Sequence, residues 1–384
     1  MRVCLLAVLL IVPVMLRAQG TPVPSRDLRE LQAIARADSN DPVAHYNVAA
    51  VLVDKHRYDD AERSLRQAIG IDPHYAPALL LLSRVIGARA TKGPIAVLFD
   101  GPRIMFVRVA KNNSEMMRFR RRAFLLDPLL ELGPPNREWL PAKWAGTLRQ
   151  ALRAYEHAQW SEAITGFQTV IDRTVRPTDS TRVPPVALWF RARTAMRVGD
   201  YDGAIRHLQW LTALASPDSA SRERIWNPFV GEELRYILAY VHQQASRWDD
   251  ATRLYQELLE QNLGLDVAHS HLAEIYEAQG RWSDAIQERR RAIDANPEDP
   301  GLLFDLGSTL AYGGQYEEAE GTLVQYAGAH PRESRIYYLL GYARMRLGKS
   351  GAAREALTQY LALAPHRYGQ QIADAKQRLA AIGP

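Results

Sequence analysis

Four alanines recur at a constant interval in the C-terminal part of the sequence. Ala251, Ala285, Ala319 and Ala353 are each separated by 34 residues, and the first three follow an aromatic residue by three positions. A constant period of this length indicates that one short structural unit is repeated along the chain. A fold built around a central sheet is therefore not expected.

Each repeated unit contains two apolar segments with the spacing of amphipathic helices. A small residue in the first helix (Ala273, Gly307 or Gly341) is expected to face the alanine of the second helix, so that the two helices approach closely. A glycine ends the first helix with a positive φ, and a proline stops the second helix. The glycines are Gly280, Gly314 and Gly348, and the prolines are Pro297, Pro331 and Pro365.

The pattern resembles that of the tetratricopeptide-repeat family, as in the unit with Leu272-Ala273, Tyr276, Gly280, Ala285 and Pro297. The resemblance implies an all-α, right-handed α-solenoid, in which neighbouring helix-turn-helix units bury one another's apolar faces. The register continues upstream to Ala61 with insertions, which gives about eight units. The resemblance also implies a protein that binds other proteins.

The sequence predicts five segments along the chain. Residues 1–18 have a basic start, an apolar run too short to span a bilayer and a small residue at the end, as in a cleaved export signal. Residues 19–41 contain a linker and a capping helix. Residues 42–175 and 185–365 hold the N-terminal and C-terminal repeats, and residues 366–384 form a second capping helix. The protein is therefore expected to be exported, either periplasmic or secreted.

An insertion at residues 91–111 interrupts the turn between two partner helices. Its two β-branched runs flank a Gly-Pro turn, which predicts a hairpin or an irregular loop. The spacing of Arg118, Arg121 and Arg122 places them on one helix face after it, suited to an acidic partner, a lipid headgroup or an anionic cell-wall polymer. The alternative is that the insertion packs on the solenoid and these arginines only solvate it.

A row of aromatic residues is the second candidate binding site. In the family the first helices line the concave face, so aromatic side chains at the fifth position of each unit are candidates for holding a partner segment. The alternative is that they only pack between helices. These residues are Tyr46, Trp189, Tyr236, Phe304 and Tyr338.

The sequence predicts no catalytic, cofactor or metal site. The motif Gly348-Lys349-Ser350 lacks the earlier glycine of a phosphate-binding loop, and a formal net charge of +5 is too small to favour nucleic acid. The predicted function is a non-catalytic scaffold or adaptor of the cell envelope that binds a protein or peptide, with peripheral contact to an envelope surface. The alternative is a binding module for an anionic glycan or lipid headgroup. The sequence leaves the oligomeric state open.

Overall fold

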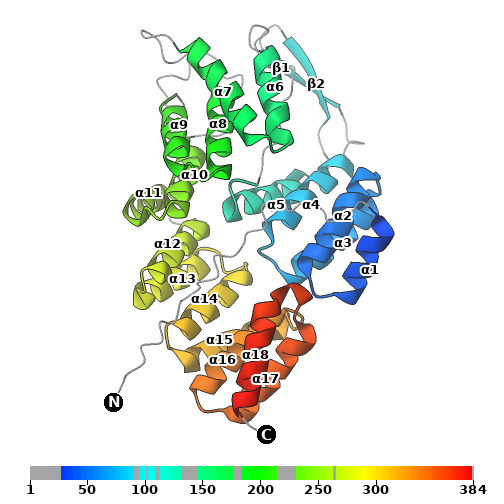
Figure 1. Ribbon diagram of the computed structural model, residues 1–384, viewed down its shortest axis with the longest axis vertical. Coiled ribbons are helices and arrows are strands. Elements are labelled where there is room, and N and C mark those ends of the chain that lie inside the picture. Colours follow the sequence, from blue (N-terminus) through cyan, green and yellow to red (C-terminus); the bar gives the residue numbers. More distant parts are fainter. Residues whose placement is uncertain are drawn as a thin grey trace. The chain divides into compact units, whose positions relative to one another are not determined.

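The structure is a computed structural model that describes residues 27–89, 95–100, 103–108, 113–130, 145–175, 183–214, 231–262 and 265–382. The predicted export signal at residues 1–18 lies outside these ranges. The described residues are α-helical apart from one two-stranded hairpin (Figure 1). The predicted all-α fold with one insertion is confirmed.

Within the described ranges, the helices form eight consecutive pairs with one further helix at each end. The pairs are α2 (Pro42–Asp54) and α3 (Tyr58–Ile71), α4 (Ala76–Arg89) and α5 (Asn113–Leu126), α6 (Ala145–Glu156) and α7 (Trp160–Thr174), α8 (Pro185–Arg197) and α9 (Tyr201–Leu214), α10 (Gly231–Gln244) and α11 (Trp248–Gln261), α12 (Asp266–Ala278) and α13 (Trp282–Ala295), α14 (Gly301–Tyr312) and α15 (Tyr316–Ala329), and α16 (Ser334–Arg346) and α17 (Ser350–Leu363). The end helices are α1 (Leu28–Ala37) and α18 (Gly369–Ile382), which follows the short helix η5 (His366–Tyr368). Second helices also pack on the first helix of the next pair, as α3 does on α4 and α15 on α16. This continuity is what makes a stack of pairs a solenoid.

Apart from the connection between α4 and α5, each turn inside a pair has one residue with positive φ among the described residues; in the α8–α9 turn it is Gly199, with φ of 79°. Gly280, Gly314 and Gly348 have φ values of 72°, 84° and 72°, as predicted from the sequence. Residues with a side chain occupy the corresponding position in three other turns, with φ of 58°, 56° and 57°: His56, Ala158 and Ser246. Because a Cβ atom disfavours this conformation, these three turns are strained where the glycine turns are not.

The close approach of paired helices differs in one detail from the prediction. Gly307 and Gly341 lie nearest to leucines rather than to Ala319 and Ala353. A Cβ atom on Gly307 would lie 2.7 Å from the side chain of Leu323, and one on Gly341 would lie 2.6 Å from that of Leu357. Each leucine is four residues past the alanine, about one helical turn. The absent side chain of the glycine therefore makes room for a large residue, while the alanine is buried beside it.

The insertion contains a β-hairpin. Strands β1 (Ile95–Asp100) and β2 (Arg103–Arg108) are antiparallel, with Asp100 opposite Arg103 and Ile95 opposite Arg108. Helices α4 and α5 on either side pack against each other as partners. The hairpin alternative is therefore confirmed, as is the interrupted helix pair.

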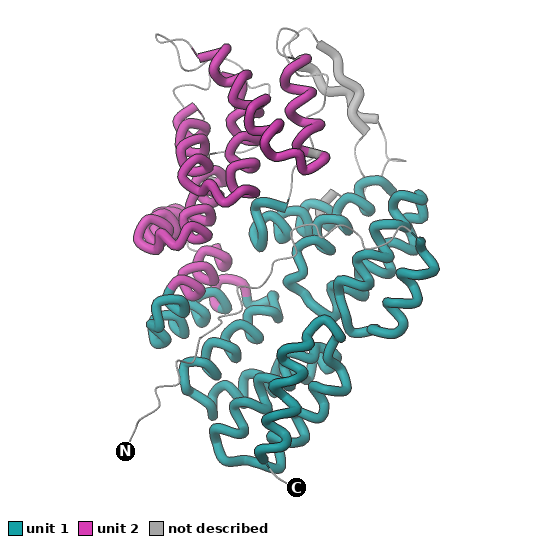
Figure 2. Tube along the Cα trace, viewed as in Figure 1, with its two compact units in different colours: residues 1–130, 276–293, 297–384 teal, residues 131–275, 294–296 magenta. Residues whose placement is uncertain are grey.

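The chain divides into two compact units (Figure 2). Unit 1 contains residues 1–130, 276–293 and 297–384, and unit 2 contains residues 131–275 and 294–296. The boundary falls within α12. Unit 1 thus combines the first helix pairs of the chain with the last ones. The grouping of repeats into residues 42–175 and 185–365 stays a prediction.

Inside unit 1, residues of the first helix pairs and their loops contact residues of the last pairs and their loops. Nε2 of His74 lies 3.0 Å from a carboxylate oxygen of Asp299, and Arg122 pairs with the same carboxylate. Arg335 lies 3.3 Å from the carboxylate of Asp72. Two further contacts are Arg367 with Asp41, at 2.9 Å, and Arg332 with Asn40, at 3.0 Å. We call these residues the seam: Asn40, Asp41, Asp72, His74, Arg122, Asp299, Arg332, Arg335 and Arg367.

Candidate functional site

The predicted groove residues of unit 2 are buried. Trp189 on α8 is 0% exposed and Tyr236 on α10 is 3% exposed. The Tyr236 hydroxyl lies 2.9 Å from Nε2 of His271 on α12. These rings fill space between helices, as the packing alternative describes.

The groove residues of unit 1 also make internal contacts. Phe304 on α14 is 8% exposed. Tyr46 on α2 is half-buried and lies edge-on to Tyr75, with ring centroids 5.7 Å apart. The hydroxyl of Tyr338 on α16 donates to Asp374 at 2.6 Å. Partner binding by this row stays a prediction.

The predicted arginine face on α5 is divided by the seam. Arg118 and Arg121 are exposed, whereas Arg122 is half-buried and pairs with Asp299. Arg120, between them, is also exposed. Of the predicted anionic-partner patch, Arg118 and Arg121 therefore remain accessible, and its binding role stays a prediction.

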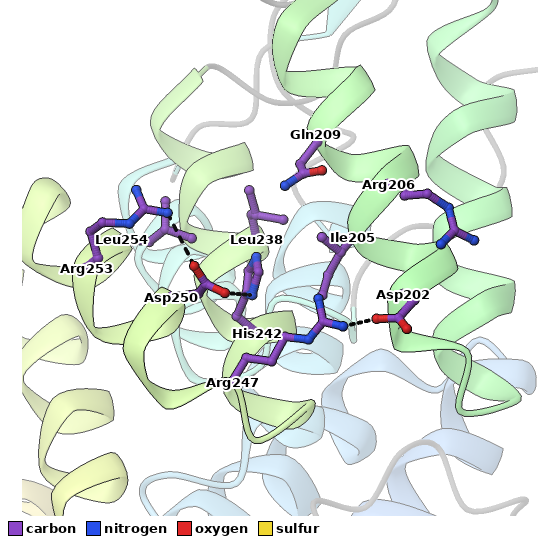
Figure 3. Close-up of a pocket in the computed structure, with 10 residues that line it drawn as sticks. All are labelled: Asp202, Ile205, Arg206, Gln209, Leu238, His242, Arg247, Asp250, Arg253 and Leu254. Carbon is purple, nitrogen blue, oxygen red and sulfur yellow. Dashed lines mark hydrogen bonds and ion pairs between the residues drawn. The ribbon is translucent and has the colours of Figure 1, made fainter.

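Unit 2 contains a pocket of about 360 Å³ formed by α9, α10 and α11 (Figure 3). Its buried lining consists of Ile205, Leu238, His242 and Leu254. Its exposed rim consists of Asp202, Arg206, Gln209, Arg247, Asp250 and Arg253. A buried lining inside a charged rim is a common arrangement for recognising one side chain or small group.

Helical spacing places these side chains together. On α9 the lining residues recur at intervals of three or four, at positions 202, 205, 206 and 209, and so share one face. The same spacing relates Leu238 to His242 on α10 and Asp250 to Leu254 on α11. The pocket thus forms where faces of adjacent helix pairs meet.

Ion pairs fix the rim of the pocket. Arg247, the residue before α11, pairs with Asp202 on α9 and so links two neighbouring helix pairs (Figure 3). Arg253 lies 3.6 Å from Asp250 and 2.8 Å from Glu257. All of these side chains are at least 41% exposed. They therefore orient the rim but add little to the free energy of unfolding.

His242 is the buried polar group of the pocket and is 5% exposed. Its Nδ1 lies 3.5 Å from Oδ2 of Asp250 and has no hydrogen-bond partner in the described structure. Burial lowers the pKa of His242; Asp250 opposes this shift, and Arg247 and Arg253 add to it. The imidazole is therefore neutral at neutral pH, and its Nδ1 is a buried polar atom whose hydrogen-bonding capacity is not used.

Positive charge is in excess beside the pocket. Arg206 on the rim is exposed and has no ion-pair partner among the described residues. On α8, Nε and Nη1 of Arg191 are buried without a hydrogen-bond partner. Burial lowers the pKa of Arg191; Asp200 raises it, and the charge of Arg206 lowers it further. Two guanidinium groups that destabilise each other indicate a place where an anion would be favourable.

Sequence reasoning did not find this pocket. Asp249 and Asp250 lie in the first turn of α11, where acidic residues complement the helix dipole. The proximity of Asp250 to His242 depends on how α10 and α11 pack. The sequence signal was limited to arginines at positions 206, 247 and 253, which look like ordinary surface residues.

Two features bear on other classes of site. None of the helices in the described ranges combines the length and apolar character needed to cross a bilayer. Within the same ranges, no group of three or more His, Cys, Asp or Glu side chains is placed to hold a metal ion.

Family models identify the repeats. One model described as a tetratricopeptide repeat matches residues 236–300 and 304–368, and a second matches residues 43–75. With the stacked helix pairs, these matches define an α-solenoid of helix-turn-helix repeats, a class that provides scaffolds for protein–protein interaction. The chain therefore contains tetratricopeptide repeats at residues 43–75, 236–300 and 304–368. No curated protein matches it.

Solved structures of other repeat proteins are similar to the chain. The C-terminal part of a TPR repeat-containing protein from Cytophaga hutchinsonii shares 16% identity, with a TM-score of 0.46 over 61% of this chain and 92% of the other. YrrB, described as a TPR protein with an unusual peptide-binding site, shares 16% identity, with a TM-score of 0.39; the match covers 55% of this chain and 97% of YrrB. MamA from Desulfovibrio magneticus RS-1 shares 16% identity, with a TM-score of 0.37; the match covers 45% of this chain and 90% of the MamA chain.

Proposed function

We propose that the chain is an exported, non-catalytic scaffold of the cell envelope that binds a partner protein. The observation that carries this proposal is the run of eight helix pairs, matched at both ends by tetratricopeptide-repeat models. Stacked pairs of this kind present extended surfaces on which a partner segment lies. The basic start, apolar run and small residue within residues 1–18 support export.

Export is tested with a reporter enzyme that is active only after disulfide formation in an oxidising compartment. We fuse residues 1–26 to this reporter and expect activity together with a shortened fusion. The matched control replaces Leu9 and Leu10 by Asp, which breaks the apolar run and should abolish activity. An inactive, full-length fusion with the natural sequence contradicts export.

Partner binding is tested by capture from envelope extracts on the immobilised full chain. We expect one or a few proteins to be retained in stoichiometric amount, and we compare a variant that lacks residues 91–111. Loss of the same proteins from this variant assigns the contact to the insertion, and their retention assigns it to the repeats. No retention above an immobilised control protein contradicts the scaffold function.

An anionic glycan or lipid headgroup is the second candidate ligand, favoured by the exposure of Arg118 and Arg121. Sedimentation with vesicles of anionic lipid should retain the protein at low salt and release it at high salt. Changing Arg118 and Arg121 to Ala should abolish this retention. Arg122 is left intact in this test because it belongs to the seam.

A further inference from the structure

We propose that the pocket between α9, α10 and α11 is a docking site for a single acidic side chain of the partner protein. This inference rests on the proposed scaffold function. The pocket differs in place from the predicted aromatic row, because its rim is built mainly from the second helices α9 and α11, whereas that row lies on first helices.

The charge of the rim selects a singly charged anion. Three arginines and two aspartates line the pocket, and Glu257, which lies outside the lining, also pairs with Arg253. Arg247 pairs with Asp202 and Arg253 with Asp250 and Glu257, whereas Arg206 has no ion-pair partner among the described residues. A carboxylate matches the single charge of Arg206. A phosphate group would bring more negative charge close to the two aspartates.

The volume and the lining of the pocket suit a single side chain. A volume of about 360 Å³ lies near the lower end of the range for small-molecule pockets, which is roughly 300–1,000 Å³. Ile205, Leu238 and Leu254 provide apolar walls for the methylene groups of a glutamate. The lining offers two polar groups to the carboxylate, the buried His242 and the exposed Arg206. An acidic side chain therefore satisfies both the apolar and the polar part of the lining.

His242 gives the site a dependence on pH. A carboxylate placed beside the ring favours the imidazolium form and so raises the pKa of His242, which burial lowers in the empty pocket. The other charged groups near the ring are Asp250, which favours protonation, and Arg247 and Arg253, which oppose it. Binding is therefore coupled to proton uptake and should tighten as the pH falls from 7.5 to 5.5. Free glutamate side chains, with an ordinary pKa of about 4.3, stay ionised in this range.

The probe for this site is a fluorescent hexaglutamate peptide, with hexaglutamine as the neutral comparison. Fluorescence anisotropy of the full chain should show binding of hexaglutamate that tightens at lower pH. Arg206→Gln should weaken this binding about tenfold, since it removes one charge-assisted hydrogen bond. The matched control removes one exposed arginine outside both the pocket and the predicted anionic-partner patch, by Arg173→Gln, and should change affinity less than twofold. His242→Asn, checked for native circular dichroism, should abolish the pH dependence.

Three results of the peptide assay overturn the pocket site. They are equal binding of hexaglutamate and hexaglutamine, absence of binding by the natural chain, and binding by Arg206→Gln that is as tight as binding by Arg173→Gln. Capture of partner proteins on the immobilised chain shows whether only the pocket site fails or whether the scaffold function fails as well. If the natural chain and Arg206→Gln capture the same proteins equally well, the scaffold stands and the pocket is not its docking site.

Discussion

The residue with positive φ in the intra-pair turns determines how each turn responds to a side chain. Gly280 has a φ of 72°, and an added Cβ atom would meet nothing within 4 Å. Gly280→Ala should therefore lower the free energy of unfolding by about 1 kcal/mol through backbone strain alone. Ser246 already has a φ of 57°, so Ser246→Gly should raise the free energy of unfolding by up to about 1 kcal/mol. Urea unfolding followed by circular dichroism measures both.

A glycine in regular helix serves as the control for these turns. Gly321 lies inside α15, and a Cβ atom there would also meet nothing within 4 Å. Gly321→Ala should raise the free energy of unfolding by about 0.5–1 kcal/mol, because alanine favours the helix. The same substitution thus has opposite signs at Gly280 and Gly321. If both substitutions changed the free energy of unfolding in the same direction, backbone conformation would not determine how the turns respond to a side chain.

At the scale of the element, the buried alanine of each second helix limits how closely two helices pack. Ala319 is 0% exposed and clusters with Leu310, Ala311 and Ala343. Ala319→Leu should lower the free energy of unfolding by about 1–3 kcal/mol through overpacking. The control, Ala329→Leu near the exposed end of the same helix, should change it by less than about 0.5 kcal/mol. Similar losses at both sites, measured by urea unfolding, would contradict close packing at Ala319.

The helix pairs could be predicted because each depends on residues close together in sequence. The turn glycines, the prolines and the buried alanines all act within one repeat, so a period of 34 residues contains their positions. The nearest neighbour of Gly307 could not be predicted in this way. It depends on the relative offset of two antiparallel helices, which places Leu323 rather than Ala319 against the glycine.

At the scale of the whole molecule, the charged contacts of the pocket and of the seam were outside the reach of the sequence. Both depend on the rotation between successive helix pairs, which accumulates along a solenoid and is not encoded in any one repeat. Asp72 and Asp299 lie in loops between pairs, where acidic residues are common. Arg122 was predicted to bind an external anion, and the structure gives it an internal one, Asp299.

The seam gives unit 1 contacts that an ordinary solenoid lacks. In such a solenoid each repeat contacts only its neighbours, and local unfolding spreads from one repeat to the next. Here Arg122 on α5 pairs with Asp299 in the loop before α14, and their side chains are 17% and 9% exposed. Removing one partner of a charge pair with little exposure destabilises the fold because the other charge loses its compensation. The effect of a change in α5 should therefore reach α14 directly.

Hydrogen exchange measured by mass spectrometry tests this coupling. Arg122→Gln should increase amide exchange in α5 and also in α14, although these helices are not neighbouring repeats. Arg121→Gln is the matched control, because it removes the same charge from the preceding, exposed position of α5. It should leave exchange in α14 unchanged. If Arg122→Gln raises exchange in α5 and its neighbours α3 and α4 but not in α14, the seam does not couple the first pairs to the last, and unit 1 behaves as a nearest-neighbour solenoid.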